Sequence, residues 1–201
     1  MARLQLNKSS LAREQTQLNR YERFLPSLDL KRQQLMAERV KAREEVRRLE
    51  DEVQELAQQV GAKLPMLAQQ SIDLDGLVEL KDYRVKEVNV VGVKMPDLDR
   101  IEVAVRPYSL LAKPHWVDAA AQLLHDMIEA RLRVKVAEER VRIFDKAVAT
   151  ITQRVNLFEK VLIPRAKANI KKIRIYLSDE QMQAVVRSKI SKRKHAQEAA
   201  P

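Results

Sequence analysis

The chain has 201 residues, of which 33% are charged, 45% hydrophobic and only 4% aromatic, and it contains 3 Gly. Such a composition is typical of long helices, because a large compact core draws much of its area from aromatic side chains. The absence of Cys excludes disulfides, thiolate metal centres and thiol catalysis, and it fits a reducing cytosolic setting. Most of the net charge of +10 lies between Arg165 and His195, where basic residues far outnumber acidic ones.

Residues 1–60 are predicted to form an N-terminal coiled-coil helix. Apolar residues recur there at heptad spacing, most clearly as Val46, Leu49, Val53, Leu56 and Val60. Pro26 interrupts this pattern, because proline removes a backbone hydrogen bond and disfavours the helical conformation of the residue before it. Leu25 and Leu28 nevertheless keep the heptad frame across it. We therefore predict a kink near Pro26, with a true break as the alternative.

Residues 61–114 are expected to form a small head, because glycine, proline and β-branched residues cluster there. Apolar and other residues alternate from Ile101 to Val105, which predicts a strand, and Val85–Met95 reads as a second strand. The alternation changes phase at Val90 and Val91, which suggests a bulge. The turn-like run Pro96–Arg100 is predicted to join the two strands. The sequence thus predicts a β-hairpin at about residues 85–106.

Residues 115–177 are predicted to form a second coiled-coil helix that begins near Pro114. Two interleaved heptad positions run through it, and a long seam of this kind needs a partner helix. The candidate seam residues are Val134, Val141, Phe144, Val148, Ile151, Val155, Phe158 and Leu162. After Phe158 the apolar spacing becomes three consecutive fours, an insertion that unwinds a left-handed supercoil locally. Because Pro164 coincides with this slip, we expect a bend there.

Residues 178–201 are expected to form a separate basic helix or tail, because Ser178-Asp179-Glu180-Gln181 resembles a capping box. The two long helices have similar lengths, and the residues between them are enough to reverse the chain. The predicted fold is therefore mainly α: a long antiparallel two-helix coiled-coil hairpin with a small head, containing a β-hairpin, in the middle of the chain.

The basic C-terminal part supplies the candidate partner-contact residues, which are Lys171, Lys172, Arg174, Arg187 and Lys189. A solvated polar face is the simpler interpretation of the same charges. Nucleic-acid binding through phosphates is a further alternative, but Tyr176 is the only aromatic residue in this part and offers no stacking platform. We predict no catalytic, cofactor-binding or metal residues, since the three His are scattered and no phosphate-binding glycine loop exists.

The C-terminal part of the chain contains a series of short motifs, which are Arg154-Val155-Asn156-Leu157-Phe158-Glu159, Ile163-Pro164, Ile170-Lys171-Lys172-Ile173 and Leu177-Ser178-Asp179-Glu180. In this order they resemble the C-terminal signature of the D subunit of the V-type rotary ATPases. Arg187-Ser188-Lys189-Ile190, Leu28–Leu35 and Val91–Pro96 resemble further family motifs, the last of these a hairpin motif. The chain departs from the family pattern at Phe24–Ser27 and at Phe158.

This resemblance implies a non-catalytic axle in a central stalk, present in one copy per complex. Its paired helices would enter the catalytic A/B hexamer, and its head would meet the F subunit of the stalk and the C/d-type subunit on the membrane ring. Rotation would couple ATP synthesis or hydrolysis to H⁺ or Na⁺ transport. The resemblance implies no cofactor and no direct nucleic-acid contact. It places the protein at the cytoplasmic face of the membrane, peripherally, with membrane contact only through partners. The competing hypothesis is a structural coiled-coil adaptor or tether without motor function.

Overall fold

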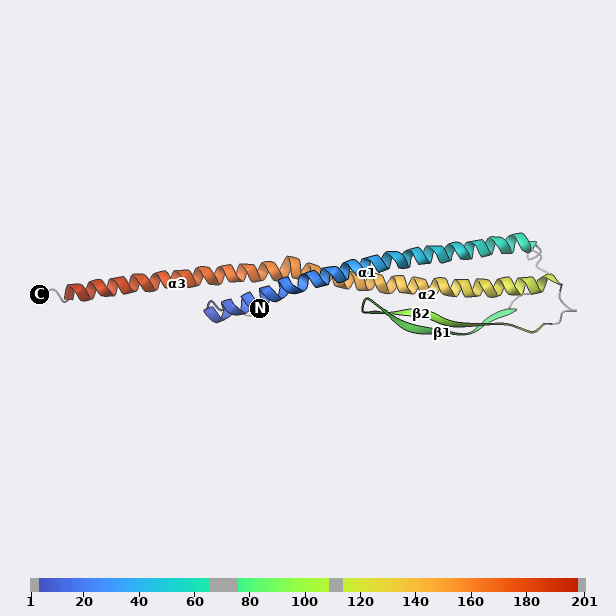
Figure 1. Cartoon of the computed structure of the whole chain (residues 1–201), viewed down its shortest axis with the longest axis horizontal. Coiled ribbons are helices and arrows are strands. Elements are labelled where there is room, and N and C mark those ends of the chain that lie inside the picture. The colour runs from blue at the N-terminus through green and yellow to red at the C-terminus, as the bar shows by residue number, and fades with distance from the viewer. Residues whose placement is uncertain (1–3, 66–75, 109–113, 199–201) are drawn as a thin grey trace. The chain divides into compact units, whose positions relative to one another are not determined.

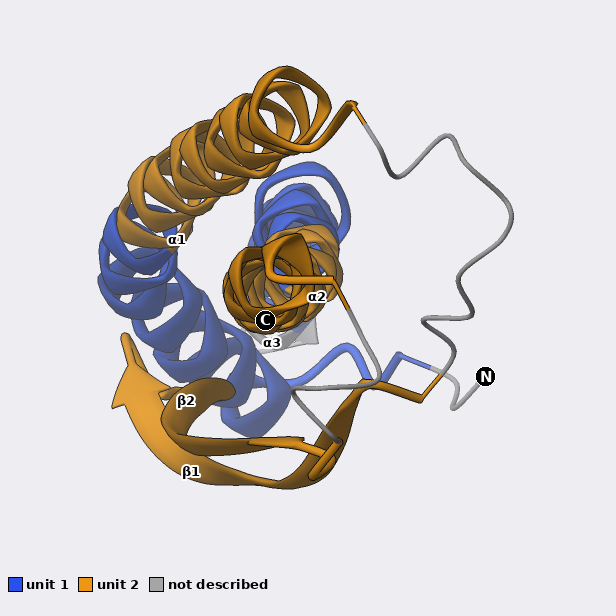
Figure 2. Cartoon of the chain, turned by 90° about the vertical axis from the view of Figure 1, so that its right-hand side faces the viewer, with its two compact units in different colours: residues 1–31, 151–201 blue, residues 32–150 orange. Residues whose placement is uncertain are grey.

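The computed structural model describes residues 4–65, 76–108 and 114–198 and is mainly helical (Figure 1). Its elements, in chain order, are α1 (Lys8–Lys63), β1 (Val78–Val90), β2 (Val93–Val105), α2 (Trp116–Leu157), η2 (Phe158–Leu162) and α3 (Ile163–Glu198). Residues 1–31 and 151–201 form unit 1, and residues 32–150 form unit 2 (Figure 2). The predicted fold class, helical with a small central β-hairpin, is confirmed.

Helix α1 is continuous for 56 residues and contains Pro26, so the alternative of a break in the helix at that proline is wrong. Its first turn is capped by Asn7, whose Oδ1 accepts a hydrogen bond from the backbone N–H of Ser10 at 2.7 Å. Such a bond satisfies one of the N–H groups that a helix start leaves unpaired. Leu35, Ala42 and Leu49 are buried at intervals of one heptad. Helix α1 therefore presents a narrow apolar stripe.

The hairpin is longer than the sequence predicted, and its turn lies elsewhere. Strands β1 and β2 pair antiparallel from Val78 opposite Val105 to Val90 opposite Val93. The two turn residues, Val91 and Gly92, have φ of 53° and 75°. Positive φ at both positions is what a two-residue turn needs in order to match the twist of the strands. The predicted turn at residues 96–100 is wrong, because those residues lie inside β2.

Helices α2 and α3 are joined without a break by the π-helical segment η2. The backbone N–H of Ile163 donates to the carbonyl oxygen of Phe158, five residues earlier. This extra residue in one turn coincides with the change in apolar spacing seen in the sequence, and it directly precedes Pro164. Ser178 lies inside α3, so the prediction that a new helix starts there is wrong. The helix continues because no helix-breaking residue follows Pro164 before its end.

Unit 2 has an apolar cluster where the chain passes between the helices and the hairpin. Trp116 and Val117, at the start of α2, pack with Ala120, Ala121, Leu64 and Leu77. The backbone N–H of Arg106 donates to the carbonyl of Leu77 at 2.9 Å and closes the base of the hairpin. Because Val117 is fully buried and Val78 packs against the cluster, the start of α2 is held against the beginning of β1.

Charged contacts join the two helices of unit 2 in antiparallel order. Arg43 Nη2 lies 3.0 Å from Asp145 Oδ1, and Arg140 Nη1 lies 3.5 Å from Glu45 Oε2. Strand β2 covers this helix pair, since Asp97, Leu98, Asp99 and Ile101 line one cavity together with residues of α1 and α2. The residue on β2 that is most completely buried is Met95, at 1% exposure. The hairpin is therefore packed along the helices of its own unit.

Candidate partner-binding surface

The first part of α1 lies antiparallel to η2 and α3 within unit 1. Asn169 Nδ2 donates to Glu14 Oε2 at 3.3 Å, and Lys167 Nζ lies 2.9 Å from Glu22 Oε1. Helix α3 buries Ala166, Ile170 and Ile173. Their spacing of three and four residues places them on one face of a helix. This apolar face fixes which side chains of α3 point outward.

Three of the candidate contact residues flank that buried face. Lys171, Lys172 and Arg174 lie immediately beside Ile170 and Ile173, and all three are exposed. Within residues 4–65, 76–108 and 114–198, none of the three forms an ion pair. Cations that have no acidic partner of their own are available to a carboxylate or phosphate from outside the chain.

The other two candidates lie farther along the same helix. Every residue from Ser178 to Lys194 is exposed, including Arg187 and Lys189. Arg187 donates a hydrogen bond to Gln183 Oε1 at 3.3 Å, one turn earlier. Lys171 and Lys189 are 18 positions apart, or roughly 27 Å at the rise of an α-helix. The structure thus brings the first three cations together and leaves the last two separate from them.

A comparison with known protein families identifies the chain. The model of the family described as the D subunit of ATP synthase matches residues 10–193, which cover unit 2 and most of unit 1. The chain belongs to the ATP synthase D-subunit family.

Individual members of that family match along nearly their whole length. The V-type ATP synthase D subunit of Borreliella burgdorferi is 36% identical over 192 residues, covering 96% of this chain and 95% of that protein. The V-type ATP synthase D subunit of Chlamydia abortus is 33% identical over 196 residues, covering 96% of this chain and 94% of that protein. The likeness to these D subunits therefore extends over nearly the whole chain.

The seam residues of this D-subunit family member lie along α2 and η2. Phe144, Val148, Ile151 and Val155 are buried, and their spacings of three and four residues form one continuous stripe. Val134 and Val141 are half-buried in unit 2, and Phe158 and Leu162 are half-buried in unit 1. The stripe runs from α2 into η2, where the rings of Tyr21 and Phe158 pack edge to face.

The sequence did not reveal the ion pairs that cross the helix pair of unit 2. Asp145 accepts contacts from Arg43 and, at 3.6 Å, from Arg39. Arg39 occupies a seam position in the heptad pattern that includes Leu35 and Ala42. A cation at a seam position was the sequence signal that could have indicated an ion pair there. Its side chain is 27% exposed, which allows the guanidinium to reach the edge of the seam.

Residues 4–65, 76–108 and 114–198 contain no group of three or more His, Asp or Glu that could hold a metal ion. None of the helices in the same ranges has a stretch of sufficient length and hydrophobicity to span a membrane. His125 lies 3.3 Å from Asp126 and is partly exposed.

Proposed function

We propose that this chain is the non-catalytic central-stalk rotor component of a V-type ATP synthase or ATPase. It transmits rotation between the catalytic A/B hexamer and the membrane ring, and so couples ATP synthesis or hydrolysis to H⁺ or Na⁺ transport. The observation that carries the proposal is the match of residues 10–193 to the D-subunit family. The antiparallel helix pairs inside each unit support it.

The helix pairs suit the transmission of torque. In a coiled-coil pair, side chains of one helix interlock with those of the other, so that neither helix can turn alone. Here the buried stripe of α2 and the Arg43–Asp145 contact act between the same two helices. A helix pair of this kind bends and twists little, so it can transmit torque. Because the rotor is also asymmetric, it can present a different side to each of several catalytic interfaces.

The proposed partners follow from this role. They are the catalytic A/B hexamer, the F subunit of the stalk and the C/d-type subunit on the membrane ring, with one copy of this chain in each complex. We assign Lys171, Lys172 and Arg174 to the contact with the hexamer, because they are exposed and have no acidic partner in the described part of the chain. The protein works peripherally at the cytoplasmic face of the membrane.

The test removes these three charges together. A Lys171→Gln, Lys172→Gln, Arg174→Gln variant is expected to unfold at nearly the wild-type temperature, since the side chains are exposed. ATP-driven ion pumping by membranes that contain the variant should fall severalfold, because each lost contact weakens the binding of the rotor to its partners. Neutralising exposed Arg47 of unit 2 is the control. Full pumping by the triple variant would contradict the contact role.

A further inference from the structure

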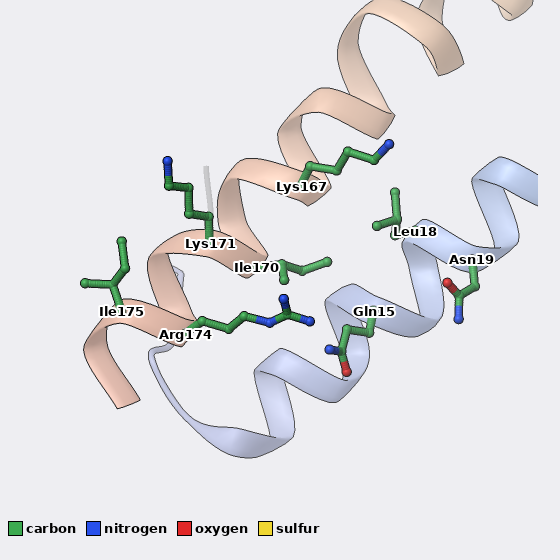
Figure 3. A pocket seen from close by; sticks show the side chains of 8 residues that line it. All are labelled: Gln15, Leu18, Asn19, Lys167, Ile170, Lys171, Arg174 and Ile175. Atoms are coloured by element: carbon green, nitrogen blue, oxygen red, sulfur yellow. The ribbon is translucent and has the colours of Figure 1, made fainter. Parts of the chain in front are cut away.

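A groove in unit 1 runs between the first part of α1 and the first part of α3 (Figure 3). Its volume is about 530 Å³. Helix α1 contributes Gln15, Leu18 and Asn19, and α3 contributes the other lining residues, which are Lys167, Ile170, Lys171, Arg174 and Ile175. Figure 3 shows the Arg174 side chain extending across the groove toward Gln15.

The charge of the groove is of one sign. Lys167, Lys171 and Arg174 are spaced by four and three residues, so they share one face of α3. No Asp or Glu is among the lining residues. Glu22 already pairs with Lys167 at 2.9 Å, whereas Lys171 and Arg174 have no acidic partner in the described ranges. The groove is therefore complementary to a ligand with at least two negative charges.

The groove also has apolar walls. Ile170 is buried at its floor, and the side of the groove includes Ile175, which is 53% exposed although it is a large apolar residue. Leu18 faces the groove from α1. A phosphate polyanion gains nothing from such walls, whereas a protein segment can place an aliphatic side chain against them. The combination of cations and aliphatic side chains favours a protein ligand.

We propose that this groove binds an acidic helical segment of another protein in the complex. Two carboxylates one helical turn apart pair with Lys171 and Arg174, and an aliphatic side chain between them packs on Leu18 and Ile170, which point toward one another (Figure 3). A helix is the fitting shape because its side chains repeat at three and four residues, the spacing of the cations that face it. The inference rests on the proposed function, which supplies the partner.

Carbodiimide cross-linking tests the contact in the purified complex, because this reagent joins a lysine amine directly to a touching carboxylate. Lys171 is expected to be linked to an Asp or Glu of another protein of the complex, identified by mass spectrometry. Lys160 is the control, since it is exposed, belongs to the same unit and does not line the groove. Equal linkage of both lysines, or linkage of Lys171 only within this chain, would overturn the proposal.

Charge reversal gives an independent measurement. Lys171→Glu should weaken retention of this chain in the complex by about tenfold, and Lys160→Glu by less than about twofold, because only the first places like charges face to face. Equal effects of the two variants would refute the groove contact. Binding of inorganic polyphosphate to the isolated chain that is lost in Lys171→Glu would assign the groove to a phosphate ligand instead. Absence of the wild-type chain from the complex would refute the proposed function itself.

Discussion

Tyr21 of α1 and Phe158, the first residue of η2, meet edge to face, with ring centroids 5.4 Å apart and ring planes at 82°. This geometry brings the positive edge of one ring to the negative face of the other. The two rings meet at η2, the π-helical turn that contains one residue more than an α-helical turn. The aromatic pair therefore holds α1 against the one irregular turn between Trp116 and Glu198.

We predict that the two rings stabilise unit 1 jointly. In a double-mutant cycle with Tyr21→Leu and Phe158→Leu, the coupling free energy should be ~1 kcal/mol, the value typical of aromatic pairs beyond their area burial. Urea unfolding of the four proteins provides the measurement. The same cycle between Tyr21 and Phe144 serves as the control and should show no coupling. A coupling within error of zero for the first pair would contradict the prediction.

Asp145 is expected to set the alignment of the helices in unit 2. Asp145→Asn removes the charge that faces Arg43 and Arg39, and should lower the free energy of unfolding by about 1 kcal/mol, because the groups are only partly buried. The loss should shrink in high salt, which screens the original pair. Asp51→Asn, at an exposed position on α1, should change stability little. Equal losses in the two variants would show that the pair contributes nothing specific.

The small residues of the seam should tolerate no enlargement. Ala137 on α2 is 4% exposed, so Ala137→Leu has to displace neighbouring atoms and should cost about 1–3 kcal/mol of stability. Ala149 lies on the same helix and is exposed, which makes Ala149→Leu the matched control. Thermal unfolding of both variants is the measurement. A stabilised Ala137→Leu protein would show that the helices can separate there without cost.

The sequence predicted the helices well because their signal is periodic. The heptad stripe needs only the identities of residues such as Phe144 and Val148, and both are buried. The hairpin turn was misplaced for a local reason. Pro96 reads as a turn residue, yet it sits within β2 opposite Glu87, and the actual turn uses the β-branched Val91 at positive φ. Pairing across the hairpin outweighed the local preferences of single residues.

The basic surface was predicted only in part, because charge content does not determine neighbours. The sequence identified Lys171, Lys172 and Arg174 as a group, but it could not show that Lys171 and Arg174 line the groove while Lys172 does not. That distinction depends on the helical phase after η2. The sequence also could not predict the ion pair between Lys167 and Glu22, because the two residues lie far apart in sequence.

The turn of the hairpin offers a stabilising substitution. Val91 has φ of 53°, a conformation that costs a β-branched residue more than it costs Asn. Val91→Asn creates the Asn-Gly pair preferred in such turns and should raise stability by about 1 kcal/mol. Gly92→Val, which introduces a second β-branched residue at positive φ, should lower it. Thermal unfolding compares the two variants with the wild type, and a destabilised Val91→Asn protein would count against this turn geometry.

Tyr108 should ionise at unusually high pH. Its hydroxyl donates a hydrogen bond to Asp118, and this bond, followed by burial and the negative charge of Asp118, raises the pKa of Tyr108 above 10.0. Because the folded pKa is raised, the stabilisation is complete below pH 10.0 and is lost as the pH rises through the folded value. An ultraviolet titration of wild type against Tyr108→Phe isolates this group.

Asp118→Asn supplies the control for that titration. Removing the carboxylate should return the pKa of Tyr108 toward its ordinary value, because both the charged acceptor and the repulsion between like charges disappear. Tyr83, which is 51% exposed on β1, provides the reference tyrosine through Tyr83→Phe. An unchanged Tyr108 titration in Asp118→Asn would show that another group is responsible.

The π-helical turn is the place in this helix where the number of residues can change with little effect on direction. Because η2 holds one residue more than an α-helical turn, deleting one residue within Phe158–Leu162 would restore an ordinary turn and leave the helix beyond it nearly in phase. A deletion in regular helix between Ile163 and Ile170 would instead rotate Lys171 and Arg174 by about 100° about the helix axis. The orientation of these cations therefore depends on the length of the helix after η2 far more than on the length of η2 itself.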